Sequence, residues 1–142
     1  MKYKVEFWGA TNAYELEDRD NNLYHAMVNF DEKMSPKDCD ISTYPESKIS
    51  KQKERDIIEA IIKYEKGNLL IPLKYKIKFL GAQRTYELED RNNDSYITNI
   101  YFDKKMNIEN YIIDDTGAGK KVSKQKGKEI IETIIKYEKE KQ

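Results

Sequence analysis

Lysines cluster at the start of two isoleucine-rich segments, where they could bind an anion. Each segment follows a Ser-Lys-Gln-Lys run, in which the serine is expected to cap a helix. Free N–H groups at a helix N-terminus attract anions, whereas lysines in the first turn oppose the helix dipole. A solvated helix end explains the same residues, so both interpretations stay open. The candidate anion-binding residues are Lys51, Lys53, Lys120, Lys121, Lys124 and Lys126.

Acidic residues form a second set that could do chemistry. Glu15 and Glu17 alternate with apolar residues, which would place both carboxylates on one face of a strand, as a catalytic pair requires. Lys2 and Lys4 offer a simpler explanation, because ion pairs between neighbouring strands form readily and contribute roughly 0.2–1 kcal/mol each. The same acidic run recurs at residues 86–91. We therefore expect a solvated charged face and no enzymatic activity.

Two segments resemble binding loops but lack the residues that binding needs. Residues 18–22 begin like a calcium loop, but Leu23 stands where glycine is required and Asn29 where a bidentate glutamate is required. An Asx-type turn is the better interpretation. Residues 115–121 resemble a phosphate loop, but Asp114 occupies the place of its first glycine. Neither segment predicts a metal or cofactor.

His25 and Cys39 are the only histidine and cysteine in the chain. Ile97 occupies the position that matches His25 in the second half, so that position accepts an apolar side chain. A zinc site or a Cys–His nucleophile pair would need further partners that the sequence does not supply. We expect both residues to have packing roles and expect no cofactor.

The elements that must position these residues appear twice in the chain, which is the strongest signal for the fold. Residues 14–19 recur unchanged at 86–91, and residues 57–66 recur at 130–139 with one substitution. Alternation over residues 2–8 predicts a strand, and Gly9 with the residues after it predicts a hairpin turn. Two further strands are predicted in each half, with a short fourth strand at 40–43 and at 111–114. Isoleucines at helical spacing then predict a helix with a buried stripe made of Ile57, Ile58, Ile61 and Ile62, and of Ile130, Ile131, Ile134 and Ile135.

We therefore expect an α+β protein made by tandem duplication of a βββ(β)α module with a pseudo-twofold axis. Each module would form an antiparallel sheet covered by one helix. The modules would span residues 1–68 and 74–142, with a short apolar connector at 69–73. A module of about 70 residues is marginal alone, so the two should pack as one compact unit.

Composition narrows the choice of partners. The chain has 26 basic and 26 acidic residues and therefore no net charge, which argues against a general polyanion binder. Its first residues do not resemble a signal peptide, and no apolar run approaches membrane-spanning length. We expect a cytoplasmic protein with no membrane partner.

Tyrosines and divergent segments indicate where a partner would bind. Tyr44, Tyr101 and Tyr111 are predicted to point outward or to lie in loops, and exposed tyrosines favour protein interfaces. Segments 35–48 and 107–121 differ while the framework around them repeats. We expect a non-enzymatic interaction protein that binds, and thereby inhibits or regulates, another macromolecule through the outer sheet face and these loops. The alternative is a nucleotide signal or nucleic acid bound at the lysine-rich helix starts, and self-association is compatible with either.

Overall fold

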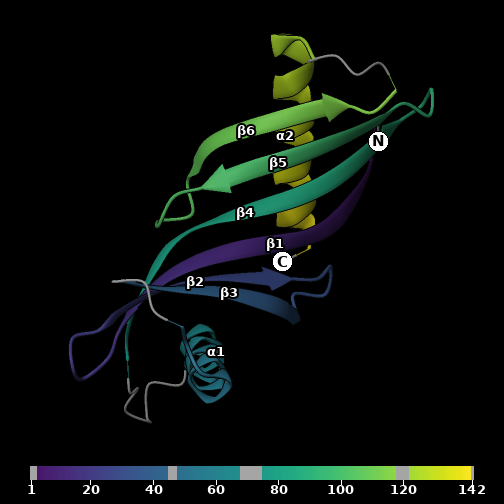
Figure 1. Ribbon diagram of the computed structural model, residues 1–142. Helices are drawn as coiled ribbons and strands as arrows, with labels where there is room; N and C mark the ends of the chain where they lie inside the picture. Colours follow the sequence, from purple (N-terminus) through teal and green to yellow (C-terminus); the bar gives the residue numbers. More distant parts are fainter. Residues whose placement is uncertain (1–2, 45–47, 68–74, 118–121, 142) are drawn as a thin grey trace.

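The computed structural model describes residues 3–44, 48–67, 75–117 and 122–141. The protein is α+β, with a six-stranded antiparallel sheet and two helices (Figure 1). The strand order is β3-β2-β1-β4-β5-β6, so the first strand of each half of the chain lies at the centre of the sheet. The elements are β1 (Tyr3–Glu17), β2 (Leu23–Phe30), β3 (Pro36–Tyr44), α1 (Lys51–Glu65), β4 (Lys76–Asp90), β5 (Ser95–Phe102), β6 (Ile108–Asp115) and α2 (Lys124–Glu140).

The two central strands join the halves into one sheet. β1 and β4 are each 15 residues long and pair antiparallel from end to end, with Tyr3 opposite Asp90 and Glu17 opposite Lys76. β2 pairs only with the C-terminal half of β1, and β5 only with the C-terminal half of β4. The expectation of a separate sheet in each half is therefore wrong, because the long strands pair with each other.

Both central strands continue through the glycine segments where we predicted hairpin turns. Residues 9–12 lie inside β1 and residues 81–84 inside β4. Instead of turning, each strand has a register shift that leaves Trp8 and Leu80 as extra residues in a β-bulge. In each half, the first two predicted strands are therefore one continuous strand, and the described part of each half has three strands. The predicted short fourth strands correspond to β3 and β6.

Each bulge keeps the apolar side chains on one face of the sheet. In β1 the buried positions are odd-numbered before the bulge, at Tyr3 and Phe7, and even-numbered after it, at Tyr14 and Leu16. A regular strand would have sent the second pair to the opposite face, since successive side chains alternate. The extra residue restores the phase, so one face of the sheet receives both helices.

The helices begin and end largely as the sequence predicts. The Ser50 hydroxyl accepts a hydrogen bond from the Lys53 N–H at 3.1 Å, and the Ser123 hydroxyl accepts one from the Lys126 N–H at 3.2 Å. Both predicted N-caps are confirmed. α1 ends just before Gly67, which adopts a positive φ of 68°. Neither described helix is long and apolar enough to cross a membrane.

The predicted isoleucine stripe is correct for most of its members. Ile57, Ile61, Ile130, Ile131 and Ile134 are buried, and Ile58 and Ile62 are half-buried. Ile135 is 38% exposed, so its predicted burial is wrong. It follows Ile134 directly and therefore lies about 100° further round the helix, away from the sheet.

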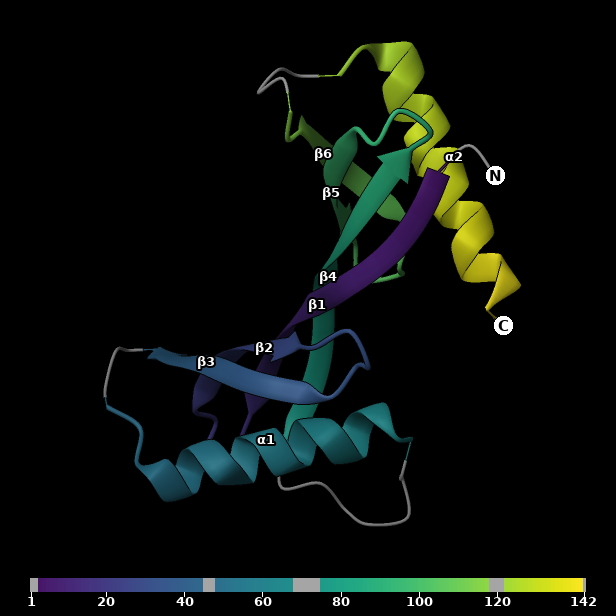
Figure 2. The same ribbon diagram turned by 90° about the vertical axis from the view of Figure 1, so that its right-hand side faces the viewer.

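Each helix covers a core built from both halves of the chain (Figure 2). Under α2, the β1 residue Phe7 packs on Tyr86 with ring centroids 5.3 Å apart. Under α1, the β4 residue Phe79 packs on Tyr14 at 5.8 Å. The halves therefore exchange the N-terminal segments of their long strands, and neither core is complete without the other half.

Candidate functional site

The sheet face opposite the helices, here called the open face, carries exposed apolar side chains. Trp8 is 44% exposed and Leu80 40%, and these bulge residues lie on the two central strands. Met27 on β2 is 51% exposed and Ile112 on β6 is 48% exposed. No described helix or strand lies over this face (Figure 2). In the strand register, polar residues of the same face separate these four side chains from one another.

Polar side chains on the open face hold one another in place. The Thr11 hydroxyl donates to Asn29 Oδ1 at 2.6 Å. In the second half, the Gln83 amide and the Thr85 hydroxyl donate to Asn99 Oδ1 at 3.1 and 2.7 Å. These cross-strand bonds lie between the exposed apolar residues. They fix the surface before any partner arrives, which lowers the entropic cost of binding.

The open face is acidic although the chain is neutral. The residues that alternate away from the helix face include eight carboxylates and three lysines. The bulge residues of β3 and β6, Lys37 and Glu109, carry opposite charges that cancel. Since the whole chain has no net charge, the rest of the molecule carries the matching positive excess. The carboxylates are Glu6, Glu15, Glu17, Asp38, Asp40, Glu87, Glu89 and Asp114, and the lysines are Lys4, Lys76 and Lys78.

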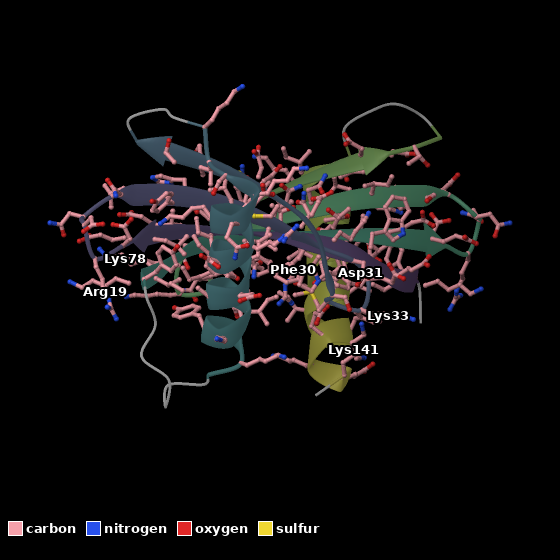
Figure 3. All side chains as sticks on the ribbon, turned by 60° about the horizontal axis from the view of Figure 1, so that its bottom comes forward. Arg19, Phe30, Asp31, Lys33, Lys78 and Lys141 are labelled. Atoms are coloured by element: carbon pink, nitrogen blue, oxygen red, sulfur yellow. The ribbon has the colours of Figure 1, made fainter. Side chains whose placement is uncertain are left out.

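The two ends of the β1–β4 strand pair, here called the seam, carry different combinations of charge. At one end, which also holds Arg19 (Figure 3), Lys78 lies opposite Glu15. At the other end, Glu6 lies opposite Glu87. Like charges directly opposite destabilise a strand pair, and the difference between the two arrangements is roughly 0.2–1 kcal/mol. The expected pairing of lysines with glutamates is therefore present between β1 and β4, but only some of the glutamates lie opposite a lysine.

The three candidate interface tyrosines do not share one surface. Tyr101 lies half-buried on the open face, opposite Asn110 and Gln83. Tyr111 lies on the helix face, next to α2. A Cβ atom added to Gly127 would lie 3.6 Å from the Tyr111 ring. Tyr44 ends β3, and its side chain lies outside the part of the chain that the structure describes.

One lysine at the start of each helix is held by groups of the protein itself. Lys53 Nζ lies 3.7 Å from Asp18 Oδ2 and 5.4 and 5.6 Å from the ring centroids of Tyr24 and Tyr75. Its charge is therefore shared with a carboxylate and two aromatic faces.

The start of α2 has the same arrangement. Lys126 Nζ lies 3.9 Å from Asp90 Oδ2 and 5.6 and 5.1 Å from the ring centroids of Tyr3 and Tyr96. Lys51 and Lys124 are exposed, whereas Lys120 and Lys121 fall outside the described residues. The two helix starts lie at distant ends of the molecule (Figure 2), so the structure does not bring the candidate lysines together.

Asp18 organises the turn between β1 and β2, as the predicted Asx turn requires. Its Oδ1 atom accepts the backbone N–H groups of Asp20 and Asn22, both at 2.9 Å, and its Oδ2 atom accepts the Tyr24 hydroxyl at 3.0 Å. Burial acts to raise the pKa of Asp18. The hydrogen bonds from Asn22, Tyr24 and Asp20 outweigh it and hold the pKa at about 2, below the ordinary 3.8.

This depressed pKa predicts a loss of stability in acid. A carboxyl whose pKa is lower in the folded state stabilises the fold above its unfolded pKa, and that contribution is lost as pH falls through the folded pKa. The urea concentration at the unfolding midpoint of the wild-type protein should therefore decrease as the pH is lowered from about 4 to about 2. Asp18→Asn should show a smaller fall over this range than Asp20→Asn, an exposed control in the same turn. Equal falls in the two variants would contradict this role of Asp18.

His25 and Cys39 have different surroundings. His25 is exposed on the open face, so its predicted packing role is wrong, because β2 turns that position away from the helices. Cys39 packs half-buried against the core under α1, as expected. Burial, with nearby Glu54, raises the pKa of its thiol to about 11. In the described ranges, no group of three or more histidine, cysteine, aspartate or glutamate residues is arranged to hold a metal ion.

No protein-family model, curated protein or solved structure matches this chain. Its function must therefore be inferred from its own residues. Trp8 and Leu80 are not among the site residues that the sequence predicts, because the pattern places both at the ends of strands beside turns. The signal was present in the change of apolar positions from odd to even, which a bulge explains as well as a turn does.

Proposed function

We propose that this is a non-enzymatic interaction protein that binds another protein through its open face and thereby inhibits or regulates it. The observation that carries the proposal is the exposure of Trp8, the only tryptophan, at the centre of an uncovered sheet. Tryptophan dominates the binding energy of protein interfaces when a partner covers it. Leu80, Met27 and Ile112 are further exposed apolar residues on the same face.

The charge of the open face favours a protein over a nucleic acid as the partner. A nucleic-acid-binding surface is basic because it must neutralise phosphates, whereas this face carries excess carboxylates. The exposed lysines at the helix starts remain the place where the alternative, an anionic ligand, would bind. They lie on separate ends of the molecule, which suits two small contacts less well than the open face suits one broad contact.

We also infer that the halves arose by tandem duplication of a βββα unit. The element order supports this inference, as do paired interactions in the two halves. The Tyr14 hydroxyl donates to Glu65, and the Tyr86 hydroxyl donates to Glu138 at 2.9 Å. Because Trp8 and Leu80 occupy matching bulges, duplication would have placed one exposed apolar residue on each of the two central strands.

Site-specific photo-crosslinking tests the proposed face. A photoreactive phenylalanine analogue at position 8 is expected to capture a partner from the source cells, whereas the same analogue at Ile135 is not. Ile135 is a matched control because it is 38% exposed on α2, against 44% for Trp8. Equal capture from both positions, or from position 135 alone, would contradict the proposal.

The captured protein should then bind the purified chain directly. We expect Trp8→Ser to weaken this binding by about 30-fold, the effect of losing a hot-spot residue worth about 2 kcal/mol. Ile135→Ser should leave the dissociation constant unchanged. Both variants should keep the wild-type circular dichroism spectrum, since each removes an exposed side chain. An unchanged affinity in folded Trp8→Ser would exclude Trp8 as the anchor.

A further inference from the structure

The open face carries a specific arrangement of charge around its apolar residues, and this arrangement identifies the chemistry of the partner. We propose that the partner presents a basic surface, rich in arginine, to the open face. This inference rests on the proposed function, because it describes what would bind at the same site. The physical basis of the inference is charge complementarity between two surfaces, which favours the correct partner and speeds association.

The excess carboxylates border the exposed apolar residues. Within the β1–β4 seam, three glutamates lie opposite lysines, namely Glu15, Glu17 and Glu89. The other carboxylates have no lysine opposite them in the register. Glu6 precedes Trp8 by two residues on the same strand, Asp40 lies opposite Met27, and Asp114 follows Ile112 by two residues. Asp38 and Glu87 complete this set.

Carboxylates and exposed apolar side chains are therefore interspersed on this face, with Glu6 and Glu87 on the central strands and Ile112 on the edge strand β6. An arginine can contact both kinds of side chain. Its guanidinium forms paired hydrogen bonds with a carboxylate and also stacks on an aromatic face. A partner arginine placed over Trp8 could contact the indole ring while pairing with Glu6. A phosphate or an acidic peptide would meet repulsion at the same place.

The Glu6–Glu87 pair gives independent support, because it is unfavourable for folding alone. At the other end of the seam, the corresponding position holds Lys78 opposite Glu15. A lysine at position 6 would therefore give both ends of the seam a favourable pair. A local arrangement that costs stability without a folding benefit is typical of a functional surface. A cation from the partner would relieve the repulsion between the two glutamates.

Trp8 provides the measurement, since it is the only tryptophan and lies within the site. Poly-L-arginine is the probe, with poly-L-glutamate and short duplex DNA as comparisons. We expect poly-L-arginine to shift the Trp8 emission, with an affinity that falls as salt is added. Poly-L-glutamate and DNA should leave the emission unchanged. A shift produced by DNA or poly-L-glutamate, and not by poly-L-arginine, would overturn the proposal.

Charge reversal locates the effect on the face. Glu6→Lys combined with Glu87→Lys should weaken poly-L-arginine binding by about tenfold or more. Glu132→Lys combined with Glu140→Lys is the matched control on the exposed side of α2 and should bind like the wild type. Glu6→Lys alone should weaken binding while raising the urea midpoint, which a purely structural role would not produce. Equal affinities for wild type and both double variants would overturn the proposal.

The natural partner separates this inference from the proposed function. If the protein cross-linked at position 8 binds less tightly at higher salt and to Glu6→Lys, both are supported. If Trp8→Ser weakens that binding but salt and Glu6→Lys do not, the basic partner is wrong and the open-face site stands. If position 8 captures nothing while Ile135 does, the site itself is wrong, whatever poly-L-arginine does.

Discussion

Replacement of Ile61 by aspartate is expected to unfold the protein. Ile61 is 1% exposed and packs in the core between α1 and the sheet. The substitution removes apolar burial and places a carboxylate among apolar side chains of the core. Such changes cost about 4–5 kcal/mol or more, which is comparable to the roughly 5–15 kcal/mol that stabilises a typical domain. Circular dichroism should show loss of the native spectrum and of a cooperative melt.

Ile135→Asp is the control for this prediction. Ile135 is also an isoleucine and lies on the other helix, α2, but its side chain is 38% exposed. The aspartate there can stay in water, so we expect a change in the free energy of unfolding within about 0.5 kcal/mol. A native-like melt for Ile61→Asp, or unfolding by Ile135→Asp, would contradict the assignment of the α1 and α2 faces.

Gly9→Ala is expected to have the second-largest effect on stability. Gly9 has a φ of 140°, and a Cβ atom built there would lie 2.5 Å from the backbone oxygen of Phe30. The added methyl group must push β2 away from β1 or straighten the bulge. We expect a loss of about 3 kcal/mol or more, because the clash adds to the cost of a strained backbone. The midpoint of urea denaturation measures this loss.

Gly81 and Gly67 make this prediction specific. Gly81→Ala should behave like Gly9→Ala, since its Cβ would lie 2.6 Å from the backbone oxygen of Phe102. Gly67 also has positive φ but has nothing within 4 Å of its Cβ position. Gly67→Ala should therefore cost only about 1–2 kcal/mol. Similar losses at all three glycines would show that backbone conformation, and not close packing at the bulges, sets the cost.

The local features of this fold could be predicted from the sequence. Ser50 and Ser123 cap the helices because capping depends on residues within one turn. The inward faces of β2 and β5 follow directly from alternation, with Tyr24 and Tyr96 buried as expected. The single sheet could not be predicted in the same way. The change in phase near Gly9 fits either a turn or a bulge, and only pairing with β4 distinguishes them.

The candidate site was harder to predict because it depends on residues far apart in the chain. Lys53 looks free for an anion in the sequence, but Tyr75 comes from the other half to cover it. The composition is neutral and does not indicate that the open face is acidic. The excess of carboxylates can be counted only when the strand register shows which residues share that face. Trp8 became a candidate only once the bulge placed it on that face.

The exchange of strand segments between the halves also bears on how the chain folds as it is synthesised. The core under α1 contains Tyr75 and Phe79, which follow α1 in the chain. When α1 leaves the ribosome, its core therefore still lacks two aromatic side chains. Tyr24 then lacks its ring partner Tyr75, and Tyr14 has Tyr64 but still lacks Phe79. The core under α2 has the opposite order, since Tyr3 and Phe7 are made before the α2 residues on which they pack. Each core can close only after both halves have been made, so until then the nascent protein exposes aromatic surface of the kind that chaperones recognise.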